Sequence, residues 1–131
     1  MTTTAHPSHL LQTLAEPTRL RIVNCLAAAP LFVQDLQAVL DLPQPTVSRH
    51  LQVLRRAELV RDTPIAQFVL YRLQRIGGPD ARLLGAILRA LDGEEAMRAE
   101  RAAAVARSRA HVRQRLPFMP DEPTPAPPSP A

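Results

Sequence analysis

Two short amphipathic segments separated by a tight break constrain the fold of this chain more than any other feature of its sequence. Apolar residues at helical spacing predict one helix over residues 33–40 and another over 46–57. The run DLPQP at 41–45 lies between them, and its two prolines interrupt a continuous helix. Two short helices joined by a tight turn, the second with a polar outer side, predict a helix-turn-helix.

The residues that follow this motif predict a β-hairpin. Extended stretches at 59–63 and 68–73 flank the turn-forming residues 64–66. A hairpin directly after the second helix of the motif is the wing of a winged helix. We therefore predict a mainly α fold, a winged helix-turn-helix with a short β-hairpin wing and further helices at both ends.

Those terminal helices carry apolar faces. We expect a short helix over 9–15 with Ser8 as its N-cap, and another helix that begins at Pro17. After the hairpin, one helical stripe consists of Leu83, Leu84, Ile87, Leu88 and Leu91. This stripe is too apolar for the surface of a monomer, and the first helix offers a matching face of Leu10, Leu11 and Leu14. We therefore expect a homodimer joined through the terminal helices.

The remaining segments lie outside this domain, which we place at 8–91. Residues 1–7 are polar and are expected to be flexible. A C-terminal helical extension is expected over 92–116, where Asp92 and Glu95 have the spacing of a capping box and Met97, Val105 and Val112 form a weak apolar face. Seven of the fifteen residues at 117–131 are proline, which predicts a disordered tail.

Composition and the absence of certain motifs exclude several classes of function. The formal net charge is +4, and a basic surplus fits a polyanionic partner. The single cysteine, Cys25, excludes an internal disulfide and a cysteine-pair zinc site within one chain.

The sequence shows neither a signal peptide nor an apolar run of transmembrane length, so we expect a cytoplasmic protein that is not attached to a membrane. No nucleophile–base pair, Gly-rich phosphate loop or carboxylate pair stands out, so we expect neither an enzyme nor a cofactor.

The second helix of the motif carries side chains suited to reading DNA. Five polar residues lie near its N-terminus, the end that normally enters the major groove: Gln44, Thr46, Ser48, Arg49 and His50. Gln pairs with adenine and Arg with guanine, each worth roughly 1–3 kcal/mol of discrimination. We therefore expect sequence-specific binding to double-stranded DNA and a role in transcription. The alternative is a protein-interaction module that uses the apolar wing and the Pro-rich tail as partner surfaces.

Three stretches of the chain resemble the ArsR/SmtB family of bacterial repressors. They read LAEPTRLRIV at 14–23, DLQAVLDLPQPTVSRHLQVLRRAELV at 35–60 and VLYRL at 69–73. The resemblance covers about residues 9–91 and implies a homodimeric repressor that an inducer releases from DNA. It also implies that the five polar residues from Gln44 to His50 occupy base-contacting positions. The identity of an inducer does not follow from these residues.

Two departures from the family pattern affect DNA binding. Pro43 stands where the family often has a serine that caps the second helix, although Pro45 in the first turn offsets part of the loss. The expected wing tip, TPIAQ at 63–67, lacks the basic residues and glycine that are usual in the family. The wing should therefore contact the minor groove weakly, which leaves Arg61 and Arg72 for phosphate contacts.

The metal sites of the family are not expected in this chain. Phe32 and Gln34 occupy the positions of its thiolate ligands, and Arg82, Gly93 and Ala96 follow Asp80 where its zinc ligands would stand. Two other candidate sensor sites remain. Cys25 is either a sensor thiol or a small packing residue, and His6, His9 and His111 are either metal ligands brought together in a dimer or exposed polar residues.

Overall fold

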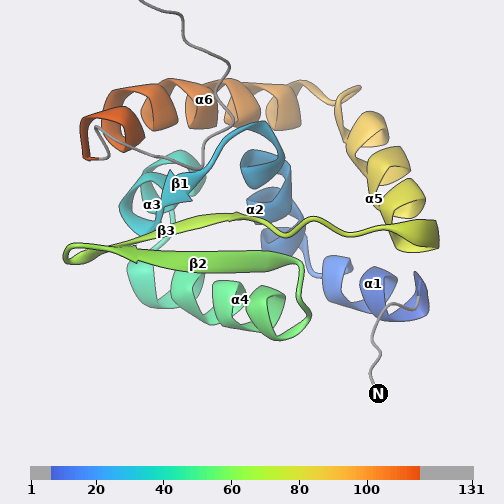
Figure 1. Cartoon of the computed structure of the whole chain (residues 1–131). Helices are drawn as coiled ribbons and strands as arrows, with labels where there is room; N and C mark the ends of the chain where they lie inside the picture. The colour runs from blue at the N-terminus through green and yellow to red at the C-terminus, as the bar shows by residue number, and fades with distance from the viewer. Residues whose placement is uncertain (1–6, 116–131) are drawn as a thin grey trace, which may run out of the picture.

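In the computed structural model, which describes residues 7–115, helix α2 (Pro17–Ala28) runs through the middle of the molecule. The other elements are α1 (Pro7–Leu14), β1 (Leu31–Phe32), α3 (Val33–Leu40), α4 (Gln44–Arg56), β2 (Val60–Ile65), β3 (Phe68–Leu73), α5 (Gly78–Leu91) and α6 (Glu95–Arg115). Figure 1 shows α4 and α6 on opposite sides of the molecule, with α1 and α5 together at one end. This arrangement confirms the predicted mainly α, winged helix-turn-helix fold.

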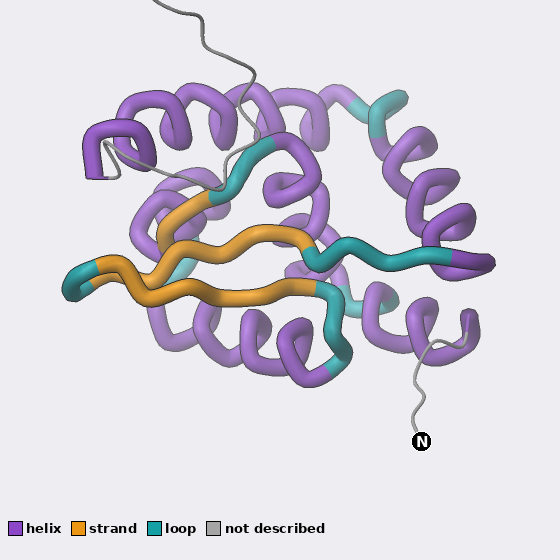
Figure 2. Tube along the Cα trace, viewed as in Figure 1, coloured by secondary structure: helices purple, strands orange, loops and turns teal. Residues whose placement is uncertain are grey.

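The wing belongs to a three-stranded antiparallel sheet with β3 in the centre (Figure 2). The β2–β3 register ends at Ile65 opposite Phe68, so the turn consists of Ala66 and Gln67 rather than the predicted residues 64–66. Ala66 has a φ of +56°, the positive value that a tight two-residue hairpin turn requires at its first position. Strand β1 was not predicted, because two residues are too few to show an alternating pattern.

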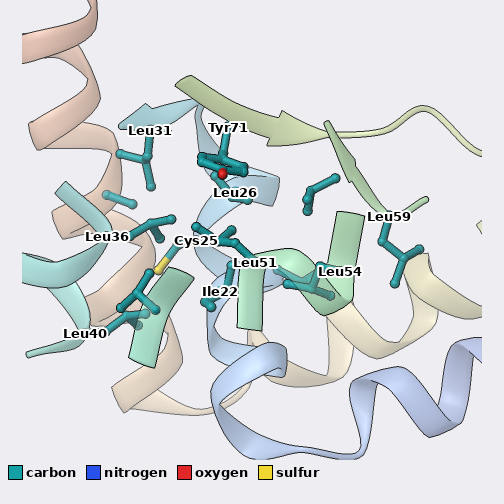
Figure 3. Packing of buried hydrophobic residues seen from close by; sticks show 14 of the residues in the cluster. Ile22, Cys25, Leu26, Leu31, Leu36, Leu40, Leu51, Leu54, Leu59 and Tyr71 are labelled. Carbon is teal, nitrogen blue, oxygen red and sulfur yellow. The ribbon is translucent and has the colours of Figure 1, made fainter. Parts of the chain in front are cut away.

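An aliphatic core fills the space between α2, α3, α4 and the sheet (Figure 3). This core includes Leu36 and Leu40 of α3, Leu51 and Leu54 of α4, and Tyr71 of β3. With few aromatic residues available, branched aliphatic side chains provide most of the buried volume. Within residues 7–115, no helix is long and apolar enough to cross a membrane.

The turn between α3 and α4 is tight because of one backbone conformation. Asp41 has a φ of +58° and ends α3, and its N–H donates to the carbonyl of Gln37 at 2.8 Å. Helix α4 begins immediately after Pro43, whose carbonyl accepts from the N–H groups of Thr46 and Val47 at 3.1 and 3.2 Å. No side chain caps this helix at Pro43, as the sequence predicts. The two helices of the motif are thus separated by only three residues.

The termini differ from the sequence predictions in detail. Helix α1 begins at Pro7, so Ser8 lies inside its first turn rather than at the N-cap. Helix α6 begins at Glu95, and Asp92 is the C-cap of α5 rather than the N-cap of α6. The side chain of Asp92 accepts from Arg101 at 3.3 Å. The buried face of α6 is Ala104, Ser108 and Val112, whereas the predicted Val105 is only half-buried. The predicted Pro-rich tail at 117–131 and residues 1–6 lie outside the described residues.

Helix α4 ends in a left-handed residue that is not glycine. The N–H of Glu58 donates to Arg55 and that of Leu59 to Leu54, which is the Schellman arrangement, and Glu58 has a φ of +62°. We expect Glu58→Gly to raise the free energy of unfolding by about 1 kcal/mol, because glycine adopts this conformation without a steric penalty. Denaturant titration measures the change.

The matched control is Glu58→Ala. It removes the same charge but keeps the strained conformation, so it should leave stability almost unchanged. Equal stabilisation by both variants would mean that the charge of Glu58, rather than its backbone conformation, limits stability.

Candidate DNA-binding surface

One-sided burial determines which face of α4 reaches solvent. Val47, Leu51 and Leu54 are each 0% exposed and anchor the helix on the core. The opposite face presents Pro45, Arg49, Gln52 and Arg56, which follow one another at helical spacing. This stripe runs the length of α4 and offers amide and guanidinium groups, the two side-chain types that form bidentate pairs with adenine and guanine.

The residues predicted for base reading do not all share this face. Gln44 and Arg49 are exposed, and Thr46 and Ser48 are half-buried near the N-terminal turn of α4. The N-terminal end of a helix attracts phosphate, because its backbone N–H groups and dipole favour negative charge there. Four of the five predicted residues are therefore accessible at the end of α4 that is suited to DNA.

His50 is placed differently from the other four predicted residues. Its side chain is 15% exposed and faces the start of α2, with Nδ1 3.5 Å from Nη1 of Arg19 and 3.8 Å from Oε1 of Glu16. Glu16 also accepts from the N–H groups of Thr18 and Arg19 at 2.7 and 3.0 Å. Partial burial opposes ionisation of Glu16, but these backbone donors outweigh it and lower its pKa. His50 thus contributes to the packing of α4 on α2, and its position does not support the predicted base contact.

The wing pairs two positive charges. Arg61 of β2 and Arg72 of β3 are directly opposite in the antiparallel register, so their side chains leave the same face of the sheet. Arg61 is exposed, and the buried Nε of Arg72 has no hydrogen-bond partner among the described residues. Like charges in directly opposite positions repel one another. An anion bound near this pair would relieve the repulsion.

Sequence reasoning gave no DNA role to two exposed residues of α4. Gln52 and Arg56 lie one and two turns beyond Arg49 on the same exposed face. Helical spacing from Arg49 could have identified them, because residues three and seven positions apart share a face.

Cys25 lies deep in the molecule. It is 0% exposed, beside Leu36 and Leu40, and its Sγ is 3.9 Å from the backbone carbonyl of Glu100 in α6 (Figure 3). Burial raises the pKa of the Cys25 thiol to about 12. The thiolate is the reactive form, so this environment suits a packing residue.

The histidine candidates are not gathered in one place within the chain. His9 is exposed on α1, His6 lies outside the described residues, and Nδ1 of His111 is 2.6 Å from Oδ1 of Asp35. Over residues 7–115, no group of three or more His, Cys, Asp or Glu side chains is arranged to hold a metal ion. At the family's metal positions, Phe32 is buried and Gln34, Arg82, Gly93 and Ala96 are exposed.

Known proteins resemble this chain over its helix-turn-helix. A family model described as a helix-turn-helix domain matches residues 14–63. The HTH-type transcriptional regulator Rv2034 of Mycobacterium tuberculosis is 42% identical over 77 residues, which cover 59% of this chain and 72% of that protein. The arsenical resistance operon repressor of Escherichia coli is 44% identical over 51% of this chain and 58% of its own length. The solved structure of the transcriptional repressor BigR from Xylella fastidiosa matches with a TM-score of 0.58 and 31% identity over 67% of this chain and 85% of that one.

The surroundings of Cys25 predict its reactivity. At neutral pH we expect iodoacetamide to modify Cys25 in the folded protein at least about a hundredfold more slowly than in the unfolded chain, because burial suppresses the thiolate. The folded-state rate should rise about tenfold per pH unit while the fold persists, since the thiolate fraction does so below the pKa. Mass spectrometry follows the reaction, and equal rates in the folded and urea-unfolded chain would contradict this reading of the site.

Proposed function

The chain belongs to the ArsR/SmtB family of helix-turn-helix transcriptional repressors, and we propose that it acts as a homodimer on an inverted-repeat operator in double-stranded DNA. The observation that carries this proposal is the exposed stripe of α4, in which Arg49, Gln52 and Arg56 face away from the core. The repressor acts on DNA in the cytoplasm and needs no cofactor for binding. Its DNA-binding and dimerisation domain spans residues 8–91, and residues 92–116 form an extension to it.

Each group of side chains on this surface has a different role in the proposal. Gln44 and Arg49 contact base edges in the major groove, and Gln52 extends the same contact surface. Thr46 and Ser48 bind the phosphate at the N-terminal end of α4. Arg61 and Arg72 bind phosphate along the wing, where the paired charges favour an anion. His50 is left out of the contact set because of its packing against α2.

The proposed dimer interface lies on α1 and α5, at one end of the molecule. Leu11 is 50% exposed, and the α5 residues Leu83, Ile87, Leu88 and Leu91 are only half-buried within one chain. A second copy would cover this apolar surface. A twofold axis through these helices would present both α4 helices to one side of the DNA, with half-sites about 34–36 Å apart.

The proposal includes no metal response of the usual family kind. Phe32 has no ligand atom, and the positive charge of Arg82 repels a cation at the zinc position. Cys25 acts as a packing residue rather than a sensor thiol, which is in line with its burial. The candidate group of His6, His9 and His111 gains no support from the described residues, because His111 binds Asp35.

The first test concerns base reading. A DNA site is selected from a random duplex library with the full chain, and affinities are then measured for that site and for a scrambled duplex. Arg49→Ala should weaken binding to the selected site by about 5- to 150-fold, because it removes a contact worth roughly 1–3 kcal/mol. Binding to the scrambled duplex should change much less.

Arg109→Ala is the matched control, since it removes an exposed arginine on α6, away from α4. It should bind the selected site as the unaltered chain does. Failure of the chain to select any site would refute the DNA-binding proposal in favour of a protein-interaction module.

The second test concerns assembly. Ile87→Glu should convert the protein to a monomer at micromolar concentration, because it would bury an unpaired charge at the centre of the proposed interface. Sedimentation velocity measures the mass of each species. Ala99→Glu on the exposed face of α6 should remain dimeric. A stable monomer formed by the unaltered chain would rule out the twofold arrangement.

A further inference from the structure

Helix α6 occupies the side of the molecule opposite α4, where it lies across α2 and α3 and reaches the sheet (Figure 1). It does not belong to the candidate DNA-binding surface. Its buried face contains the small residues Ala104 and Ser108, so it buries little apolar area for its length. Its polar contacts have specific partners, and they identify which elements depend on the placement of α6.

The first contact reaches the end of α3 through α2. Glu100 of α6 binds Arg21 of α2 with both carboxylate oxygens, and the closest approach is 2.5 Å between Oε2 and Nη2. The same Nη2 donates to the carbonyl of Leu40, the last residue of α3, at 3.1 Å. Hydrogen bonding to Glu100 raises the pKa of Arg21 further above its ordinary value, so the guanidinium stays protonated. Glu100 thereby fixes the guanidinium that holds α3 at its junction with the helix-turn-helix turn.

The second contact holds the other end of α3. Asp35 lies in the first turn of α3, and its side chain is only 4% exposed. Its Oδ1 accepts from Nη1 of Arg107 at 3.2 Å and contacts Nδ1 of His111 at 2.6 Å. Both partners come from α6. A carboxylate this deeply buried without its partners would carry a large desolvation penalty, so α3 and α6 depend on each other at this point.

The third contact reaches the wing close to its turn. Val112 of α6 packs with Phe32 of β1 and Leu70 of β3 in a second, separate cluster. Phe32 in turn meets Phe68 edge to face, with ring centroids 5.7 Å apart. Phe68 is the first residue of β3 after the wing turn. The C-terminal part of α6 thus supports the strand that positions the wing.

We propose that α6 is a positioning helix for DNA recognition, which holds both ends of α3 and the turn end of the wing so that α4 and the wing reach DNA together. The positioning residues on α6 are Glu100, Arg107, His111 and Val112. Glu100 acts through Arg21, and Arg107 and His111 act through Asp35. The turn between α3 and α4 contains only three residues, so a displacement of α3 is passed directly to α4. This inference rests on the proposed DNA-binding function, which it extends to a part of the chain far from the DNA.

The test uses the full chain with Glu100→Ala and Arg107→Ala combined, which removes the contact from α6 to Arg21 and one of its two contacts to Asp35, and so weakens the hold on both ends of α3. Glu95→Ala combined with Arg109→Ala is the matched control, because both residues are exposed on the same helix and the net charge is again unchanged. Affinity for the selected site should fall about tenfold or more in the first variant, while affinity for scrambled DNA and the dimer mass stay unchanged. The control should bind both duplexes as the unaltered chain does.

Hydrogen exchange on the free protein separates positioning from general destabilisation. Peptides over 33–47 and 66–73 should exchange faster in the first variant, whereas those of α1 and α5 should not change. Uniformly faster exchange would overturn the proposal, because it would reflect loss of global stability. If the double variant does not fold, Val112→Ala is measured instead, and it should accelerate exchange at 66–73 and weaken specific binding.

Failure of this inference is distinguishable from failure of the proposed function. If Arg49→Ala loses specific affinity and the double variant does not, the DNA-binding proposal stands and α6 has no positioning role. If the unaltered chain selects no DNA site, the function proposal fails. The exchange comparison then still decides whether α6 holds α3 and the wing.

Discussion

Burial of one face of α4 is the constraint on which the rest of the structure depends. Val47, Leu51 and Leu54 are fully buried, and each contributes about 1.5–3 kcal/mol from the removal of apolar surface from water. No other orientation of α4 would bury all three, so the outward direction of Arg49 and Gln52 follows from the packing rather than from any property of those residues. Packing of the core therefore determines which face of α4 is exposed, and no additional interaction is needed to orient its polar side chains.

A different kind of interaction holds α6. The apolar side chains of α4 contribute by leaving water, whereas Asp35 and Glu100 place carboxyl groups in partly or fully buried positions and need partners there. Such contacts add little net stability, but their geometry is specific, because losing one partner leaves a buried charge. The apolar core therefore accounts for the stability of the fold, and the polar contacts of α6 specify the placement of α3.

The sequence predicted the elements with strong periodicity and missed those determined by tertiary contacts. The segments at 33–40 and 46–57, the hairpin and the α5 stripe were predictable because their apolar residues recur at a regular period. Strand β1 and the small-residue face of α6 were not, since two residues show no period and Ala104 and Ser108 do not read as apolar anchors. Among the candidate site residues, Arg49 could be assigned to the exposed face from its distance to Val47 and Leu51. The surroundings of His50 depend on Glu16 and Arg19, which lie on another helix, so no local pattern could reveal them.

Phe32 illustrates how packing and ligand chemistry exclude each other at one position. The resemblance to the family places a thiolate ligand there, but in this chain the ring packs in one cluster with Leu70 and Val112 and meets Phe68 edge to face. An aromatic ring has no atom that binds a metal ion, and truncating it would leave a cavity at a cost of about 3–5 kcal/mol. The cavity would open where α6 meets the wing, because Phe32 and Val112 belong to the same buried cluster. A smaller metal-binding side chain at position 32 would therefore weaken the contact between α6 and the sheet, and this packing supports the proposal that the chain lacks the usual metal response of the family.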